Sequence, residues 1–162
     1  MSNEVTNYTG KVTLLDMRAD SKQFPRLHSI PREQAIAGMV KIVSQAFLYR
    51  GQASDPSNIQ FIASTLLDEL LEDDKYGARN ISLGEIQVVV KRAVLGGSDL
   101  FGISIASLYK VIMDYVKGEG HLIEREIQER KRKDSDNALR NAAALNTMLQ
   151  AYTGEYILNH KQ

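Results

Sequence analysis

The chain has 162 residues, 43% of them hydrophobic, so it can form one ordinary globular core but is short for two independent domains. It contains no cysteine, which excludes disulfides, thiolate catalysis and cysteine-based zinc sites and is typical of a reducing compartment. The twenty basic and twenty acidic residues give no net charge, so the overall charge does not indicate a polyanionic partner. With neither a basic-then-apolar leader nor an apolar run of about 18 to 20 residues, we expect a cytoplasmic protein without a membrane partner.

Residues 1–28 show no sustained hydrophobic period. Val12, Leu14 and Leu15 could form a short strand, but polar residues and scattered charges surround them. We expect this segment to be a poorly ordered N-terminal arm.

Two helices are predicted next, over residues 31–50 and 56–72. Pro31 suits the first position of the first helix, and Asp55 followed by Pro56 supplies an N-cap and first residue for the second. In both segments apolar residues recur three to four positions apart, as on the buried face of a helix.

Two further helices are predicted over residues 83–95 and 105–116. Ser82 and Glu85 have the spacing of a capping box, and Ser104 is expected to cap the last helix of the four. All four predicted helices should pack as one bundle around a shared apolar core: Ile36, Val43, Phe47, Ile62, Leu66, Leu70, Ile86, Val90, Leu108 and Ile112.

The C-terminal segment changes character at His121. Residues 124–136 hold five acids and five bases, which is typical of a helix exposed to solvent on all sides. An apolar stripe then returns at helical spacing, at Ala138, Ala142, Leu145, Leu149 and Tyr152. An exposed stripe needs a cover, so we expect a homodimer or higher homo-oligomer formed through this tail. The alternative is a hinge within residues 133–137 that returns a separate helix to its own bundle.

Together these patterns predict an all-α fold. It consists of an arm over residues 1–28, a compact four-helix bundle domain over 29–120, and a long charged helical extension over 121–162.

Candidate catalytic and metal-binding groups lack the usual spacings. The histidines, His28, His121 and His160, are each isolated in sequence, and no serine lies in a nucleophile elbow. Carboxylates cluster between Asp68 and Asp74, which fits a solvated helix end better than a cation site. We therefore expect no enzymatic activity, no metal and no cofactor.

Residues 93–116 read like a helix-turn-helix. However, the turn is longer than the usual three to four residues and the second helix begins with few basic side chains. Direct DNA binding is therefore the alternative rather than the favoured hypothesis. It would use the second helix together with the basic run that follows it in the tail: Ser107, Lys110, Arg130, Lys131, Arg132 and Lys133.

Three stretches within residues 31–126 carry a resemblance: "DPSNIQFIASTLLDELLED", "ISLGEIQVVVKRAVLGG" and "LFGISIASLYKVIMDYVKGEGHLIERE". They are similar to small all-helical proteins of unassigned function that phages and conjugative elements of Bacteroidetes encode. The positions that fall on the family pattern are Ser82, Glu85, Gly97, Phe101, Gly102, Ile103 and Tyr115. The resemblance implies an all-helical fold and a mobile-element origin, and such contexts are associated with DNA replication.

The favoured functional hypothesis is therefore a non-enzymatic, helical protein-interaction adaptor of a phage or mobile element. Its partners would be proteins, with the replication machinery as the candidate that the resemblance implies. Direct DNA binding is the first alternative, and a structural component of a virion is the second.

Overall fold

The computed structural model describes residues 12–96 and 102–159, with side chains described as far as residue 153. The chain divides into two compact units, Met1–Glu124 and Arg125–Gln162, which are described separately below. Within the described residues the fold is all-α, as predicted, and no β-strand occurs. The elements are α1 (Leu14–Ala19), η1 (Leu27–Ser29), α2 (Arg32–Tyr49), α3 (Pro56–Glu72), η2 (Ala78–Asn80), α4 (Leu83–Leu95), α5 (Ile105–Lys117) and α6 (Glu119–Asn159).

The helices of the first unit begin where the sequence supplies capping groups. Asp55 accepts a hydrogen bond from the backbone N–H of Asn58 at the start of α3, with Pro56 in the first helical position. Ser82 caps α4 in a complete capping box with Glu85, as predicted. The predicted cap of α5 is also confirmed, because the hydroxyl of Ser104 accepts from the N–H of Ser107.

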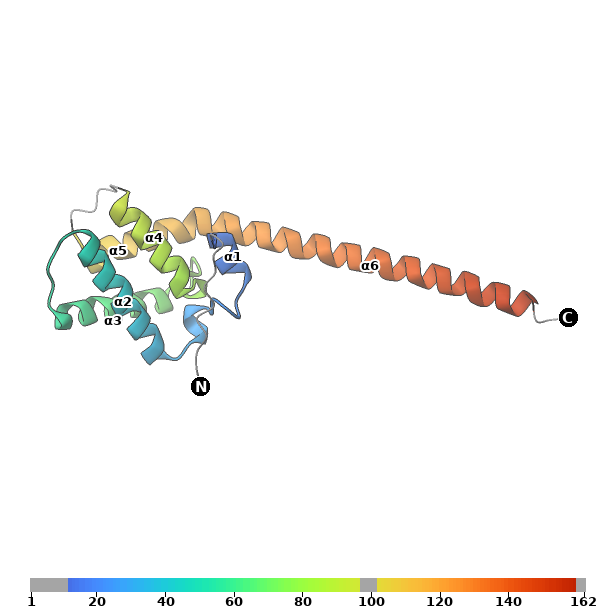
Figure 1. Cartoon of the computed structure of the whole chain (residues 1–162), viewed down its shortest axis with the longest axis horizontal. Coiled ribbons are helices and arrows are strands. Elements are labelled where there is room, and N and C mark those ends of the chain that lie inside the picture. Colours follow the sequence, from blue (N-terminus) through green and yellow to red (C-terminus); the bar gives the residue numbers. More distant parts are fainter. Residues whose placement is uncertain (1–11, 97–101, 160–162) are drawn as a thin grey trace. The chain divides into compact units, whose positions relative to one another are not determined.

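Helices α2 to α5 pack as one bundle, in which α2 contacts α3 and α4, and α5 contacts both α3 and α4 (Figure 1). Nine of the ten predicted core residues are buried, and Ile36 is partly buried. Ala35 and Met39 on the same helix are almost completely buried, at 1% and 0% exposure. The buried face of α2 is thus rotated slightly from the predicted one.

The N-terminal segment is the main correction to the predicted fold. Residues 14–19 form α1, which packs on α4 and begins at a capping box between Thr13 and Asp16. Leu14 and Leu27 lie in the core at 5% and 1% exposure. The prediction of an arm over residues 1–28 is therefore wrong for residues 12–28, while residues 1–11 lie outside the described residues.

The C-terminal segment forms one uninterrupted helix, α6, and the hinge considered for residues 133–137 does not occur. Its first residues, to Glu124, belong to the first unit, so the unit boundary lies four residues beyond the predicted one at residue 120. No helix in the described part of the chain combines the length and the apolar character needed to cross a membrane.

Candidate functional site

The predicted self-association residues lie on one exposed face of α6. Ala138, Ala142, Leu145, Leu149 and Tyr152, here called the apolar stripe, are all exposed. The spacing alternates between four and three residues, which is the spacing of a coiled-coil seam. The large members show 61% (Leu145), 64% (Leu149) and 79% (Tyr152) of their surface to solvent. These side chains thus have almost no apolar cover from the residues described around them in α6.

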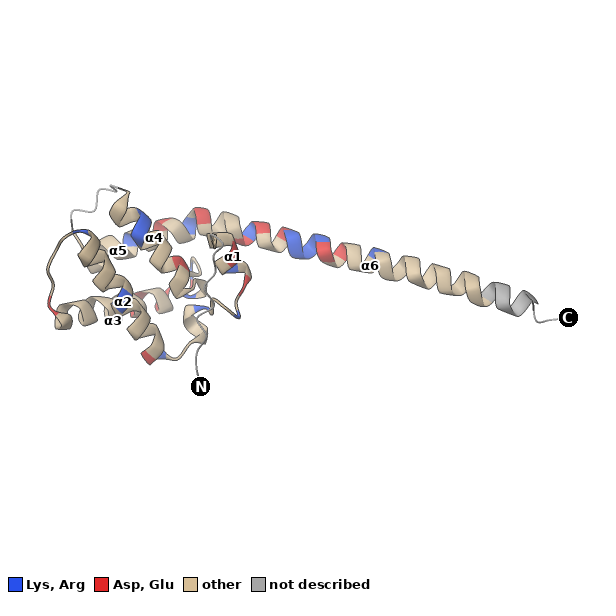
Figure 2. Cartoon of the chain, viewed as in Figure 1, with Lys and Arg blue, Asp and Glu red and all other residues tan. Residues whose placement is uncertain are grey.

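The exposed apolar surface is wider than the sequence pattern predicted. Leu139 and Met148 are 67% and 68% exposed and flank the stripe on its two sides, since successive helical residues are rotated by about 100°. Residues 137–153 carry a single charge, on Arg140, whereas residues 124–136 carry ten (Figure 2). The distal part of α6 therefore lacks the charged side chains that normally keep an exposed helix in water.

The residues of the DNA-binding alternative fall in both units. In the first unit, the hydroxyl of Ser107 donates to the backbone oxygens of Gly102 and Ser104 and accepts from the N–H of Ser104. It is thus occupied by the helix cap, while Lys110 on the same helix is exposed. In the second unit, Arg130, Lys131, Arg132 and Lys133 are exposed, and Arg130 pairs with Glu126 at 2.6 Å.

A buried charge cluster lies in the first unit around Glu85, which is 0% exposed. Its Oε1 accepts hydrogen bonds from Arg18 Nε at 2.7 Å and from Tyr115 Oη at 2.8 Å. Its Oε2 accepts from the backbone N–H and the hydroxyl of Ser82, at 2.8 and 3.0 Å. Arg26 Nη1 lies 3.5 Å from the same oxygen, close enough for an ion pair but without a hydrogen bond. The cluster ties α1 and the segment before η1 to α4 and α5.

Burial dominates the electrostatics of this cluster. It raises the pKa of Tyr115 well above the ordinary tyrosine value, and the adjacent Glu85 carboxylate adds to the rise. It also lowers the pKa of Arg26, with the positive charge of Arg18 as the next cause. The phenol therefore stays protonated and serves as a hydrogen-bond donor.

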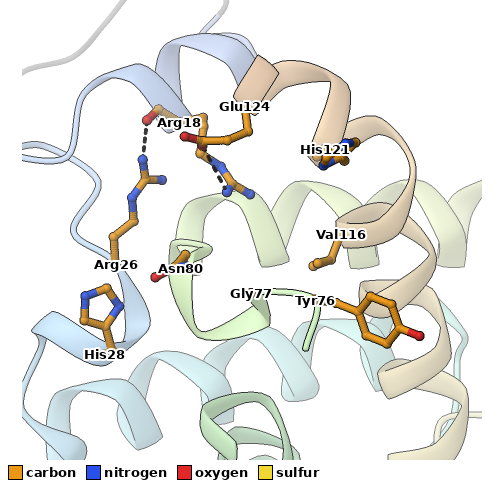
Figure 3. Close-up of a pocket in the computed structure, with 10 residues that line it drawn as sticks. Arg18, Arg26, His28, Tyr76, Gly77, Asn80, Val116, His121 and Glu124 are labelled. Carbon is orange, nitrogen blue, oxygen red and sulfur yellow. Dashed lines mark hydrogen bonds and ion pairs between the residues drawn. The ribbon is translucent and has the colours of Figure 1, made fainter. Parts of the chain in front are cut away.

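A cavity of about 400 Å³, here called the polar pocket, opens beside this cluster. Figure 3 shows Arg26, His28 and Asn80 on one side of it, Arg18 and Glu124 at the top of the view, and His121 and Tyr76 on the other side. These groups come from α1, the segment at η1, the turn between α3 and η2, η2 itself and the start of α6, all within the first unit. The lining residues are Arg18, Arg26, His28, Tyr76, Gly77, Asn80, Val116, Gly120, His121 and Glu124.

The polar pocket is the site that sequence reasoning missed. His28 and His121 look isolated because they lie 93 positions apart in the sequence, yet both line the same cavity. The turn residue Gly77, with φ of 76°, helps to shape the wall, since a side chain is strained in that conformation. No sequence spacing signals a site assembled from such short, distant segments.

The carboxylate cluster of α3 and the following turn serves structural roles. Asp68 forms an ion pair with Arg32, which lowers the pKa of Asp68. Asp73 accepts from the backbone N–H of Ala78 at 3.0 Å, and Asp74 pairs with Arg79 at 2.8 Å. Among the side chains that the structure describes, no group of three or more histidine or acidic residues is arranged to hold a metal ion.

Comparison with protein-family models, with curated proteins and with solved structures gives no match.

Proposed function

We propose that this protein is a non-enzymatic protein-interaction adaptor that assembles with copies of itself through the apolar stripe of α6. The observation that carries the proposal is the exposure of Leu145, Leu149 and Tyr152 on a segment with a single charge. Full burial of a leucine side chain contributes about 1.5 to 3 kcal/mol, so about two thirds of that gain is still available at Leu145 and Leu149. A second copy supplies a complementary surface, because the same seam can pack against itself with the alanines at the positions of close approach.

Charge favours an antiparallel arrangement of the two helices. In a parallel, in-register pair the basic run Arg130–Lys133 would lie beside its own copy. In an antiparallel pair centred on Leu145, the two Lys131 positions would be about 42 Å apart along the axis. That separation exceeds the Debye length of about 8 Å at physiological ionic strength, so the repulsion is screened.

The bundle would then be displayed in two or more copies, which suits a protein that links other proteins. The mobile-element origin and an accessory role in DNA replication rest on the resemblance of residues 31–126 alone. A non-enzymatic role is supported by the use of the hydroxyls of Ser82, Ser104 and Ser107 in helix caps.

Paired substitutions on opposite faces of α6 test the proposal. Leu145→Asp combined with Leu149→Asp places two carboxylates in the seam, and should weaken self-association by about 100-fold or more, since each 1.4 kcal/mol is a factor of ten. Ala143→Asp combined with Thr147→Asp makes the same charge change on the opposite face and should leave the oligomer intact. Light scattering coupled to gel filtration measures the molar mass of both variants. Equal behaviour of the two variants would refute the role of the stripe.

The relative orientation of the two α6 helices can be measured as the distance between two spin labels. The chain has no cysteine, so a single Lys133→Cys substitution provides one labelling position in each copy. An antiparallel pair centred on Leu145 places the two labelled positions about 36 Å apart along the axis, whereas a parallel pair places them side by side. A short interspin distance would contradict the antiparallel arrangement.

Direct DNA binding is the second candidate, favoured by the exposure of the basic run Arg130–Lys133. Binding to duplex DNA that weakens steeply with added salt, and that is lost on neutralising the run, would support it over the adaptor. A ring or filament in sedimentation would instead favour a structural role in a virion.

A further inference from the structure

We propose that the polar pocket of the first unit binds a small organic anion through its phosphate or carboxylate group. The proposal is independent of α6 self-association, because all lining residues lie within Met1–Glu124.

The guanidinium of Arg18 provides the principal anchor. Its Nε is held by Glu85 at 2.7 Å, which fixes the plane of the group. Its Nη1 lies 3.7 Å from Glu124 Oε2, too far for a hydrogen bond. Figure 3 shows this end of the side chain directed into the pocket. A preoriented guanidinium edge is the usual partner of carboxylate and phosphate oxygens.

Neighbouring groups add donors and positive charge. Arg26 adds positive charge beside Arg18, although its Nη1 is buried and faces Glu85 Oε2 at 3.5 Å. The Nδ1 of His28 lies 3.0 Å from the backbone oxygen of Arg79 and donates to it, which leaves Nε2 outside that bond. Asn80 and His121 complete the polar walls and are exposed to an entering ligand.

The charge balance around the cavity favours an anion. Arg18 and Arg26 line it, and Lys75 and Lys117 lie over the ring of Tyr76 at its edge, with 5.0 and 4.2 Å from ammonium nitrogen to ring centre. The carboxylates that interact with these groups are Glu85, Glu124 and Asp73, and the neighbouring pair of Asp74 and Arg79 adds no net charge, so the positive groups outnumber the negative ones by one.

The size of the cavity indicates more than a bare inorganic ion. Its volume of about 400 Å³ lies within the range of about 300 to 1,000 Å³ that is typical of small-molecule sites. Tyr76 and Val116 supply an apolar wall for the organic part of the ligand.

Titration of the isotope-labelled full chain, followed by NMR, tests the proposal with four probes: inorganic phosphate, glucose 6-phosphate, succinate and glucose. We expect saturable shifts of the amide signals of Gly77, Asn80 and Gly120 with glucose 6-phosphate or succinate, at a dissociation constant of about 1 mM or below. Glucose should produce none. Saturation by the phosphates alone or by succinate alone supports the proposal and identifies the group recognised. Absence of saturation with both organic anions up to about 10 mM would overturn it, even if inorganic phosphate alone produced shifts.

Substitutions at exposed Asn80 separate ligand binding from structural effects. Asn80→Asp should weaken anion binding by about fivefold or more, and Asn80→Lys should strengthen it, because the added charges act at short range with opposite signs. Gln60→Glu and Gln60→Lys make matched charge changes on an exposed position of α3 and should leave binding unchanged. Equal responses at positions 60 and 80 would show non-specific binding and overturn the proposal.

Discussion

Replacing Glu85 with glutamine should destabilise the first unit more than any other single change of charge. All groups that contact the carboxylate donate: Arg18 Nε, Tyr115 Oη, and the N–H and hydroxyl of Ser82. A glutamine amide keeps one acceptor oxygen and turns an NH₂ group toward donors on its other side. It also removes the negative charge that balances Arg18 and Arg26.

The expected loss of unfolding free energy is about 3 to 5 kcal/mol, the range for removing one partner of a buried ion pair. Total stabilities of about 5 to 15 kcal/mol are usual, so the variant should be partly unfolded or close to it. Glu126→Gln provides the matched control. It breaks an exposed pair with Arg130 one helical turn away, and should cost only about 0.3 to 0.5 kcal/mol.

Urea unfolding followed by circular dichroism, at one protein concentration and pH 7, measures both variants by linear extrapolation. A loss below about 1 kcal/mol for Glu85→Gln would refute the reasoning, because neutralising a buried carboxylate that balances two arginines should lower the unfolding free energy by more than that. A loss equal to that of Glu126→Gln would mean that water reaches the cluster.

Two further predictions concern the core and the phenol. Leu66 is 1% exposed, so Leu66→Ala should lower the unfolding free energy by about 2 to 5 kcal/mol. Leu48 is 75% exposed, so Leu48→Ala should change the unfolding free energy by less than about 0.5 kcal/mol. Urea unfolding measures both variants, and similar losses would contradict the assigned core. Burial and Glu85 raise the pKa of Tyr115 in the folded chain, so the unfolded chain releases the phenol proton at a lower pH than the folded chain does. The stability that the protonated phenol contributes is therefore present below about pH 10 and is lost as the pH rises further. Alkaline unfolding curves should therefore be flatter for Tyr115→Phe than for the natural chain, and parallel curves would contradict the buried hydrogen bond.

Local signals made much of the bundle predictable. Asp55, Ser82 and Ser104 cap helices because short polar side chains satisfy the first N–H groups, and this needs only neighbouring residues. Periodicity then assigned the buried faces. The segment around α1 was missed because Leu14 and Leu27 enter the core from a six-residue helix and a three-residue 3-10 helix, which are too short to show a hydrophobic period.

Long-range pairing could not be predicted in the same way. Glu85 was expected only as part of a capping box, whereas its ion pair joins it to Arg18 across 67 positions. The polar pocket depends on the same contact, and on His28 and His121 meeting across the fold. The apolar stripe, by contrast, was readable from spacing, although spacing could not decide between a hinge and a continuous helix.

Sedimentation equilibrium of the full chain and of a chain ending at Lys133 tests the central claim most directly. Self-assembly through the apolar stripe predicts a mass that rises with concentration from 18.1 kDa to at least twice that value for the full chain. The shortened chain, which lacks the stripe, should sediment as a monomer throughout. A full chain that is monomeric at about 100 μM, where an association of about 5.5 kcal/mol would already be half complete, contradicts the account.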